Sequence, residues 1–274
     1  MQNTAAASFD TTSLLGSTLG LRALLPLIET RTSEFTLNNL LNVFPDELGD
    51  NATPKLKYFG VGINGCYNVD DTNLQAAYNP SRTDMNLYRL IPIRCRPVDE
   101  DLSAAERANY RLRVRKTLSD GNEYYLYYLK VINYSDTDIK YKRVNPTTGA
   151  EESYELDADY LHPTPVKPTT DTTIETTAES VVAYCDVSLD LTSDEILEYI
   201  NVEYQGDTRY ARISEIGFFS GIDAEVSKYG TTYTESLYTM LYNHLTWLGV
   251  NLTSEGITYR SKFQICSNGS IDVA

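Results

Sequence analysis

Residues 55–66 read KLKYFGVGINGC, and the role of their glycines decides the fold class. Gly60, Gly62 and Gly65 have the G-x-G-x-x-G spacing that follows a strand in dinucleotide-binding domains, and the acidic residue Asp84 comes about twenty positions later. In such domains the third glycine opens a helix whose N-terminal N–H groups hold a pyrophosphate. The spacing by itself therefore points to a nucleotide-binding α/β domain.

The residues after Gly65 do not favour the helix that this motif needs. Residues 66–84 are rich in Asn, Asp and Thr, and Pro80 interrupts them. The preceding run alternates through its glycines as a strand does, with Tyr58 and Phe59 on opposite sides. A glycine within a strand more often marks a bulge or a close approach of another backbone. We therefore predict a strand here and no nucleotide site.

The composition is that of a folded soluble protein with an excess of tyrosine. The 274 residues include 22 Tyr against 7 Phe, 1 Trp and 2 His. Tyrosine with abundant Thr and Val favours strands and contact surfaces with one wet edge. The apolar stretch at 13–28 contains Arg22 and Pro26 and follows no basic leader, so we expect neither a membrane span nor a secretion signal.

Charge is unevenly distributed along the chain. The net charge is −15, and residues 151–200 hold thirteen Asp and Glu against Lys167 alone, whereas basic residues gather at 105–116. An acidic chain is poorly suited to neutralise phosphates, so we expect no nucleic acid as the main ligand. Opposed patches on one chain suit head-to-tail contacts between its copies, and ordinary solvated faces remain the alternative.

The sequence contains no constellation that predicts catalysis. His162 lies beside Pro163, and His244 lies among aromatic residues, where we predict packing and no catalytic role. None of the cysteines forms a C-x-x-C pair, which argues against zinc and favours buried thiols, with two long-range disulfides left open. The four cysteines are Cys66, Cys95, Cys185 and Cys266. P-loop, H-E-x-x-H and G-x-S-x-G motifs are also lacking, so we predict no enzyme, no cofactor and no metal site.

The chain divides into an arm and β-rich regions. Residues 1–45 read as an N-terminal arm with short leucine-bearing helices, and we expect its first part, 1–12, to be flexible. Residues 46–161 and 178–274 read as β-rich domains on either side of a Pro/Thr-rich connector at 162–177, or as one composite sandwich. We expect a mainly β protein with one or two sandwich-like domains, a helical N-terminal arm and one or two short helices.

Local signals place three further elements. Ser103 and Glu106 form a capping box and predict a short helix that becomes a strand near Arg113. Turn residues in NYSDTD (133–138) and NPTTGA (145–150) predict two hairpins.

Two segments carry mixed signals. Residues 193–204 favour a short helical turn that ends in a strand. Residues 232–252 fit a helix by their leucine spacing and a strand by their Thr and Tyr content.

The tyrosine-rich stretch 122–134, NEYYLYYLKVINY, is a candidate contact surface. We predict an aromatic platform for sugars or protein from Tyr124 and Tyr127, with Tyr125 and Tyr128 on the other face, and core packing of these rings is an equal alternative. Four further candidate partner-binding residues come from the arm and the basic segment. They are Leu24, Leu25, Arg111 and Arg113.

Two parts of the chain resemble bacteriophage structural proteins. ARISEIGFFSGID (211–223) resembles the I-[ST]-E-[IL]-G strand of phage tail-fibre and collar proteins, and residues 57–74 with 86–113 resemble structural proteins of large tailed phages. The resemblance implies a virion component of the neck, tail or baseplate, assembled in the host cytoplasm. Its implied partners are copies of itself in a ring and other virion proteins, and it transfers no catalytic residues. The fibrous repeat and Gly-rich shaft of tail fibres are lacking.

We therefore expect a structural virion protein that acts by self-assembly and by docking to partner proteins. A carbohydrate- or receptor-binding module on the virion surface is the alternative. A hydrolase on a β scaffold comes third, because it finds no catalytic residues in the sequence.

Overall fold

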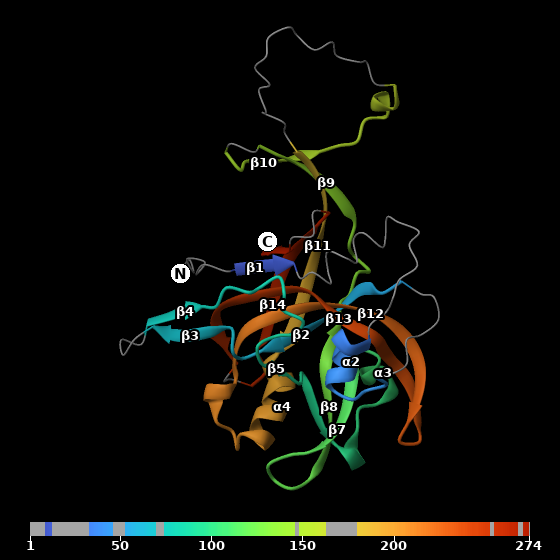
Figure 1. Cartoon of the computed structure of the whole chain (residues 1–274), viewed down its shortest axis with the longest axis vertical. Coiled ribbons are helices and arrows are strands. Elements are labelled where there is room, and N and C mark those ends of the chain that lie inside the picture. Colours follow the sequence, from blue (N-terminus) through green and yellow to red (C-terminus); the bar gives the residue numbers. More distant parts are fainter. Residues whose placement is uncertain are drawn as a thin grey trace.

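The computed structural model describes residues 9–12, 33–45, 53–69, 74–145, 148–162, 180–252, 255–267 and 271–273. Within these ranges the protein is mainly β, as predicted, and its paired strands are antiparallel. Figure 1 shows a layered body from which one part of the β-structure projects.

The larger sheet contains eight of the described strands, in the order β1-β13-β12-β2-β8-β6, with β5 beside β2 and β7 beside β8. Their bounds are β1 (Phe9–Thr12), β2 (Lys55–Gly62), β5 (Leu90–Ile91), β6 (Arg94–Pro97), β7 (Tyr110–Thr117), β8 (Glu123–Val131), β12 (Arg212–Lys228) and β13 (Thr231–Asn251). The glycine-containing strand β2 lies in the interior of this sheet, between β12 and β8.

The second sheet has the order β10-β9-β11-β14-β15 among the described strands, and β3 and β4 form a separate pair. Their bounds are β3 (Cys66–Val69), β4 (Leu74–Ala77), β9 (Ile139–Val144), β10 (Glu151–Tyr154), β11 (Ser180–Thr192), β14 (Thr258–Cys266) and β15 (Ile271–Val273). The helical elements are η1 (Ser33–Phe35), α2 (Leu37–Leu40), η3 (Val98–Glu100), α3 (Ala104–Arg107), η4 (Ala158–Leu161), α4 (Ser193–Glu203) and η5 (Thr208–Tyr210).

The glycine stretch forms the predicted strand. β2 ends at Gly62, and strand β3 begins at Cys66, where a pyrophosphate-binding motif would have a helix. A Cβ at Gly62 would overlap the carboxylate of Glu215, and one at Gly65 would overlap the carbonyl oxygen of Ser214. These glycines therefore allow the close approach of β12.

The two large sheets pack face to face. Phe59 and Val61 of β2 lie in the core between the sheets, where the rings of Phe218 and Phe263 are 5.2 Å apart. Tyr58 points to the opposite face and packs in a second core under α2. The alternation predicted for β2 is therefore confirmed.

Helix α4 replaces the turn and strand predicted for 193–204. It runs to Glu203, and its side chains Ile196 and Ile200 are fully buried. A capping box between Thr192 and Glu195 fixes its start. Burial of Ile196 and Ile200, which lie four residues apart on one face of the helix, therefore outweighs the strand preference of Val202 and Tyr204.

The segment 232–252 is a strand. Leu245 of β13 packs in the core between the sheets, and Leu241 packs in the core on the opposite face. The two leucines are four positions apart and would share a face of a regular strand, but the pairing of β13 with β12 skips one residue between Leu241 and Asn243. This bulge turns the two leucines to opposite faces, so a strand that buries both faces can have a helix-like leucine spacing.

One of the two predicted hairpins is confirmed. β9 and β10 pair across residues 145–150. The hairpin predicted at 133–138 is wrong, because β8 belongs to the larger sheet and β9 to the smaller one. The loop at 133–138 therefore carries the chain from one sheet to the other.

Both large sheets combine strands from the two β-rich regions that we predicted. Strands from 46–161 and from 178–274 pair in both large sheets, and only His162 of the 162–177 connector lies within the described residues. In the arm, residues 9–12 form strand β1 beside β13, so our expectation of a flexible 1–12 is wrong for these four. The short helix predicted from the capping box of Ser103 is confirmed as α3.

Candidate functional site

Two of the candidate partner-binding residues, Arg111 and Arg113 on β7, have buried side chains. The Nε of Arg111 donates to Asp223 Oδ1 at 2.9 Å, and a terminal nitrogen of Arg113 donates to Asp101 Oδ2 at 2.6 Å. The Arg113 guanidinium also lies 3.6 Å from the centre of the Tyr125 ring. These arginines thus form internal ion pairs and a cation–π contact.

Tyr124 and Tyr127 are buried as well. Because side chains alternate along a strand, the two point to opposite faces of β8 and do not share a platform. The hydroxyl of Tyr127 donates to Asp101 Oδ1 at 2.6 Å, and that of Tyr124 donates to Asp120 Oδ2 at 2.8 Å. Leu24 and Leu25, the remaining candidates, lie outside the described residues.

A fully buried carboxylate fastens β7 to β13. Glu235 accepts hydrogen bonds from the backbone nitrogens of Leu112 at 2.6 Å, Ser236 at 2.8 Å and Arg113 at 3.0 Å. Leu112 has a φ of 56°, which side-chain-bearing residues rarely adopt. Burial raises the pKa of Glu235, and these N–H donors oppose the rise. The carboxylate satisfies the backbone groups that this local distortion leaves unpaired in the sheet.

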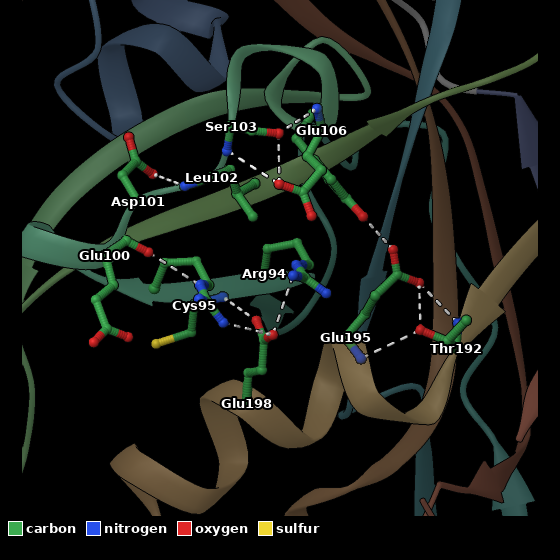
Figure 2. A network of polar contacts seen from close by, with 12 residues as sticks. Arg94, Cys95, Glu100, Asp101, Leu102, Ser103, Glu106, Thr192, Glu195 and Glu198 are labelled. Atoms are coloured by element: carbon green, nitrogen blue, oxygen red, sulfur yellow. Dashed lines mark hydrogen bonds and ion pairs between the residues drawn. The ribbon is translucent and has the colours of Figure 1, made fainter. Parts of the chain in front are cut away.

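Helix α4 is joined to the larger sheet by Glu195 (Figure 2). Its carboxylate caps the helix through Thr192, as Figure 2 shows. The same carboxylate accepts from Lys130 Nζ at 2.7 Å and from the hydroxyl of Tyr110. Burial alone would raise the pKa of Glu195, but Lys130 lowers it below its usual range. The helix start is thus held by a charged contact to β8.

A second glutamate continues this contact to β6 (Figure 2). Glu198 accepts from the backbone nitrogen of Cys95 at 3.2 Å and lies 3.2 Å from Arg94 and 3.6 Å from Arg96. Burial raises the pKa of Glu198, and the two arginines oppose the rise.

Cys95 is a free, buried thiol, and burial raises its pKa to about 12. The predicted burial holds for Cys95 and Cys266, whereas Cys66 and Cys185 are half-buried. The raised pKa of Cys95 disfavours the reactive thiolate.

The ISEIG segment has a clear structural role. The Glu215 side chain on β12 is fully buried, and its carboxylate accepts from the backbone nitrogens of Asn64 at 3.0 Å, Arg89 at 2.9 Å and Tyr88 at 2.8 Å. The hydroxyl of Ser214 accepts from the backbone nitrogen of Gly65. The two side chains therefore bind the turn after β2 and the segment before β5 to β12.

His244 completes this cluster from β13. Its Nε2 lies 3.1 Å from Glu215 and its Nδ1 lies 3.1 Å from Asp84, while its ring packs edge-on against Tyr88 with centroids 4.8 Å apart. The aromatic packing predicted for His244 is therefore present, and the two carboxylates were not foreseen. The histidine links Asp84, the acidic residue of the apparent nucleotide motif, to the interior of the sheet.

A row of partly exposed tyrosines lies outside this cluster. Tyr67 and Tyr78 have ring centroids 4.7 Å apart, and those of Tyr78 and Tyr88 are 5.6 Å apart. All three rings are exposed at about two-fifths of their area. This tyrosine row is an exposed aromatic surface at a place that we had not predicted, whereas Tyr124 and Tyr127 of β8, where we had predicted one, are buried.

A small apolar pocket opens between the two large sheets. Its volume is about 80 Å³. Most of its wall is buried, and its exposed or half-buried rim comprises Trp247, Val250, Tyr259 and Ser261. The buried lining residues are Phe59, Val61, Leu189, Leu191, Ile213, Ile216, Leu252 and Phe263. We call this space the inter-sheet pocket.

The strands β9 and β10 and the start of β11 project from the body (Figure 1). Beyond β10 the chain is exposed at 155–159 and at 161–162. Leu156 and Leu161 in this stretch are 68% and 79% exposed. We call residues 139–161, with the first residues of β11, the projecting arm.

The sequence analysis missed both the inter-sheet pocket and the exposed leucines of the projecting arm. Leu156 and Leu161 stand singly in the acidic stretch ELDADYLH, and an isolated leucine among charges is a signal for exposure. The pocket draws on strands from distant parts of the chain, and no local pattern marks it.

The described residues contain no cluster of three or more His, Cys, Asp and Glu with the geometry of a metal site. Among the described helices, none has the length and apolar character needed to cross a membrane.

Residues 1–263 match the model of a protein family described as "Family of unknown function (DUF7208)", and the chain belongs to that family. Searches of curated proteins and of solved structures gave no match.

Proposed function

We propose that this member of the family is a structural subunit of a tailed-phage virion, in the neck, tail or baseplate, which works by self-assembly and by docking to other virion proteins. The resemblance of 211–223 to the strand of tail-fibre and collar proteins supports the setting in a phage particle. The structure supplies a reason for such a motif, because Ser214 and Glu215 fix the turn after β2 and the segment before β5.

The projecting arm carries this proposal. A subunit that stays alone gains nothing from two leucines placed on an exposed extension, because their apolar surface remains in water. Placed against a neighbour, each leucine side chain contributes about 1.5–3 kcal/mol. An arm that reaches out of the body is therefore suited to contact a second protein.

The rest of the molecule suits a rigid subunit. Buried carboxylates tie α4 and the turn before β3 to the larger sheet, and one of them fastens β7 to β13 within that sheet. Such fully satisfied polar contacts specify one arrangement of the elements that bear the arm. A repeated contact in a symmetric assembly requires the same geometry in every copy.

The proposal is tested by two measurements on the full chain. Size-exclusion chromatography with light scattering should give a mass above that of one chain, and mass spectrometry of purified phage particles should find the protein at many copies per particle. A folded single chain at high concentration, together with absence from particles, contradicts the proposal.

The tyrosine row favours one alternative, a carbohydrate-binding module on the virion surface. Sugar rings stack on exposed aromatic side chains, and Tyr67, Tyr78 and Tyr88 are neighbours on one surface. A glycan array should then give saturable binding that Tyr78→Ala abolishes. The buried Tyr127, changed to Phe, serves as the control that keeps binding. An array without signal removes this alternative.

A further inference from the structure

We propose that Leu161 of one copy inserts into the inter-sheet pocket of a second copy, so that the protein assembles head to tail. The inference rests on the proposed self-assembly and names the two surfaces that meet. It joins two separate observations, an exposed apolar side chain on the projecting arm and an open apolar pocket in the body.

Leu161 has the placement expected of an inserting side chain. It ends the short helix η4, and its exposed fraction of 79% is the largest among the exposed large apolar side chains of the described residues. Its described neighbours in the sequence, 155–159 and His162, are exposed too. In Figure 1, η4 appears as the yellow-green turn of helix on the projecting part, away from the body.

The inter-sheet pocket has the chemistry to receive such a side chain. Its buried wall is built from aliphatic and aromatic residues, and its lining includes a single serine, Ser261, at the rim. An apolar cavity of about 150 Å³ holds benzene. A pocket of about 80 Å³ suits a smaller group such as the isobutyl end of leucine.

The contact must join two copies, because a single chain cannot bring the two surfaces together. The arm includes the start of β11, where Val181 pairs with Arg143, whereas Leu189 and Leu191 near the other end of β11 line the pocket. Ten residues of extended strand separate Val181 from Leu191, which corresponds to about 33 Å. Helix η4, which ends at Leu161, lies away from the body on the projecting arm (Figure 1).

A contact between two different surfaces of the same chain is heterologous. Such contacts close into a ring when the rotation between neighbours permits, and otherwise extend as a filament. Rings of identical subunits are what the proposed position in the neck, tail or baseplate requires. The pocket and the arm would each be used once by every subunit.

Point changes at the two surfaces test the inference in the full-length protein. Leu161→Asp removes the inserting side chain, and Val250→Asp places a charge at the exposed rim of the pocket. Each should weaken self-association about 10- to 100-fold, as expected from burial of one leucine. The matched control is Leu40→Asp, which changes another exposed leucine on α2 and should leave association within about twofold.

Mixing the two defective variants gives the sharper test. Leu161→Asp keeps its pocket and Val250→Asp keeps its arm, so together they should form a dimer with one copy of each and nothing larger. Ser261→Phe, which fills the pocket from its exposed rim, replaces Val250→Asp if the latter does not fold by circular dichroism. Trp247 is the single tryptophan of the chain and lines the pocket, so its emission should shift as the wild type assembles.

The outcomes separate the two proposals. If the wild type assembles and Leu161→Asp assembles equally well, insertion is contradicted while self-assembly stands. The same holds if the mixture gives no dimer or if the Trp247 emission does not change. If the wild type is a single chain at every concentration, both proposals fail.

Discussion

The carboxylate of Glu215 lies 3.1 Å from Nε2 of His244, and both side chains are almost completely buried. The pair joins neighbouring strands β12 and β13 from within. Because Glu215 also accepts from three backbone nitrogens, one side chain fixes the turn after β2 and the segment before β5. The ISEIG motif is therefore explained by structure, and a structural role suffices to account for its glutamate.

Glu215→Ala should lower the free energy of unfolding by about 3 kcal/mol or more. The change leaves the backbone nitrogens of Asn64, Tyr88 and Arg89 without their acceptor, and each unsatisfied buried group costs about 1–3 kcal/mol. Urea denaturation measures the loss. Glu225→Ala, at an exposed position of the same strand, is the control and should change stability by less than about 0.5 kcal/mol. Equal effects of the two changes would refute this role of Glu215.

Asn38→Ala should destabilise the protein by about 3 kcal/mol. The buried amide of Asn38 donates to the carbonyl oxygens of Val43 at 2.9 Å and Ser236 at 2.7 Å and accepts from the backbone nitrogen of Thr239 at 2.8 Å. It thereby bridges the β13 irregularity at Tyr238, whose φ is 53°. The unpaired groups left behind set the cost.

The neighbouring exposed residue supplies the control for this change. Asn39→Ala removes one long hydrogen bond at the surface and should leave the thermal midpoint nearly unchanged. A similar drop in both variants would show that α2 is merely sensitive to substitution and that the bridge is unimportant. Asn38 lies within residues 1–45, so deletion of these residues removes the bridge and should unfold the body. Point changes are therefore the better test of the N-terminal arm.

Lys130→Met should cost about 3 kcal/mol at pH 7 and less in acid. Breaking a buried pair leaves the Glu195 charge uncompensated. Because the pKa of Glu195 is lowered in the fold, the ion pair stabilises fully above the unfolded value of about 4.3 and is lost as the pH falls through the folded value. Urea denaturation at pH 7 and at pH 3 should show the gap to the wild type narrowing.

The exposed pair of Lys140 and Asp186 provides the comparison for this pH experiment. The side chains are 52% and 39% exposed, so Lys140→Met should cost less than about 1 kcal/mol at either pH. A gap for Lys130→Met that stays constant between pH 7 and pH 3 would contradict the assigned ion pair.

Much of the fold follows from local signals in the sequence. The alternation around Tyr58 and Phe59 predicts β2, and the spacing of Ser103 and Glu106 predicts the start of α3. Both signals depend on residues a few positions apart, which a linear pattern records. The C-terminal end of α4 was predicted wrongly, and β13 was left open between helix and strand, because burial on distant strands decides both.

The candidate site was predicted less well, for a related reason. Arg113 and Tyr127 were predicted as contact residues, with core packing as an equal alternative for Tyr127, yet both are buried. Asp101 neutralises the charge of Arg113 and accepts hydrogen bonds from Arg113 and Tyr127. Most of the backbone nitrogens that donate to Glu215 and Glu235 lie more than a hundred residues away in the sequence. Only the assembled sheets reveal which polar side chains are internal and that Leu161 is left outside.

The mass of the native protein in solution tests the central claim most directly. Sedimentation velocity or native mass spectrometry should find an assembly of several chains of 30.8 kDa each. The assembly should have a defined stoichiometry, and the fraction of protein in it should grow with concentration. A folded species of 30.8 kDa that persists at the highest attainable concentration would contradict self-assembly as the way in which this protein works.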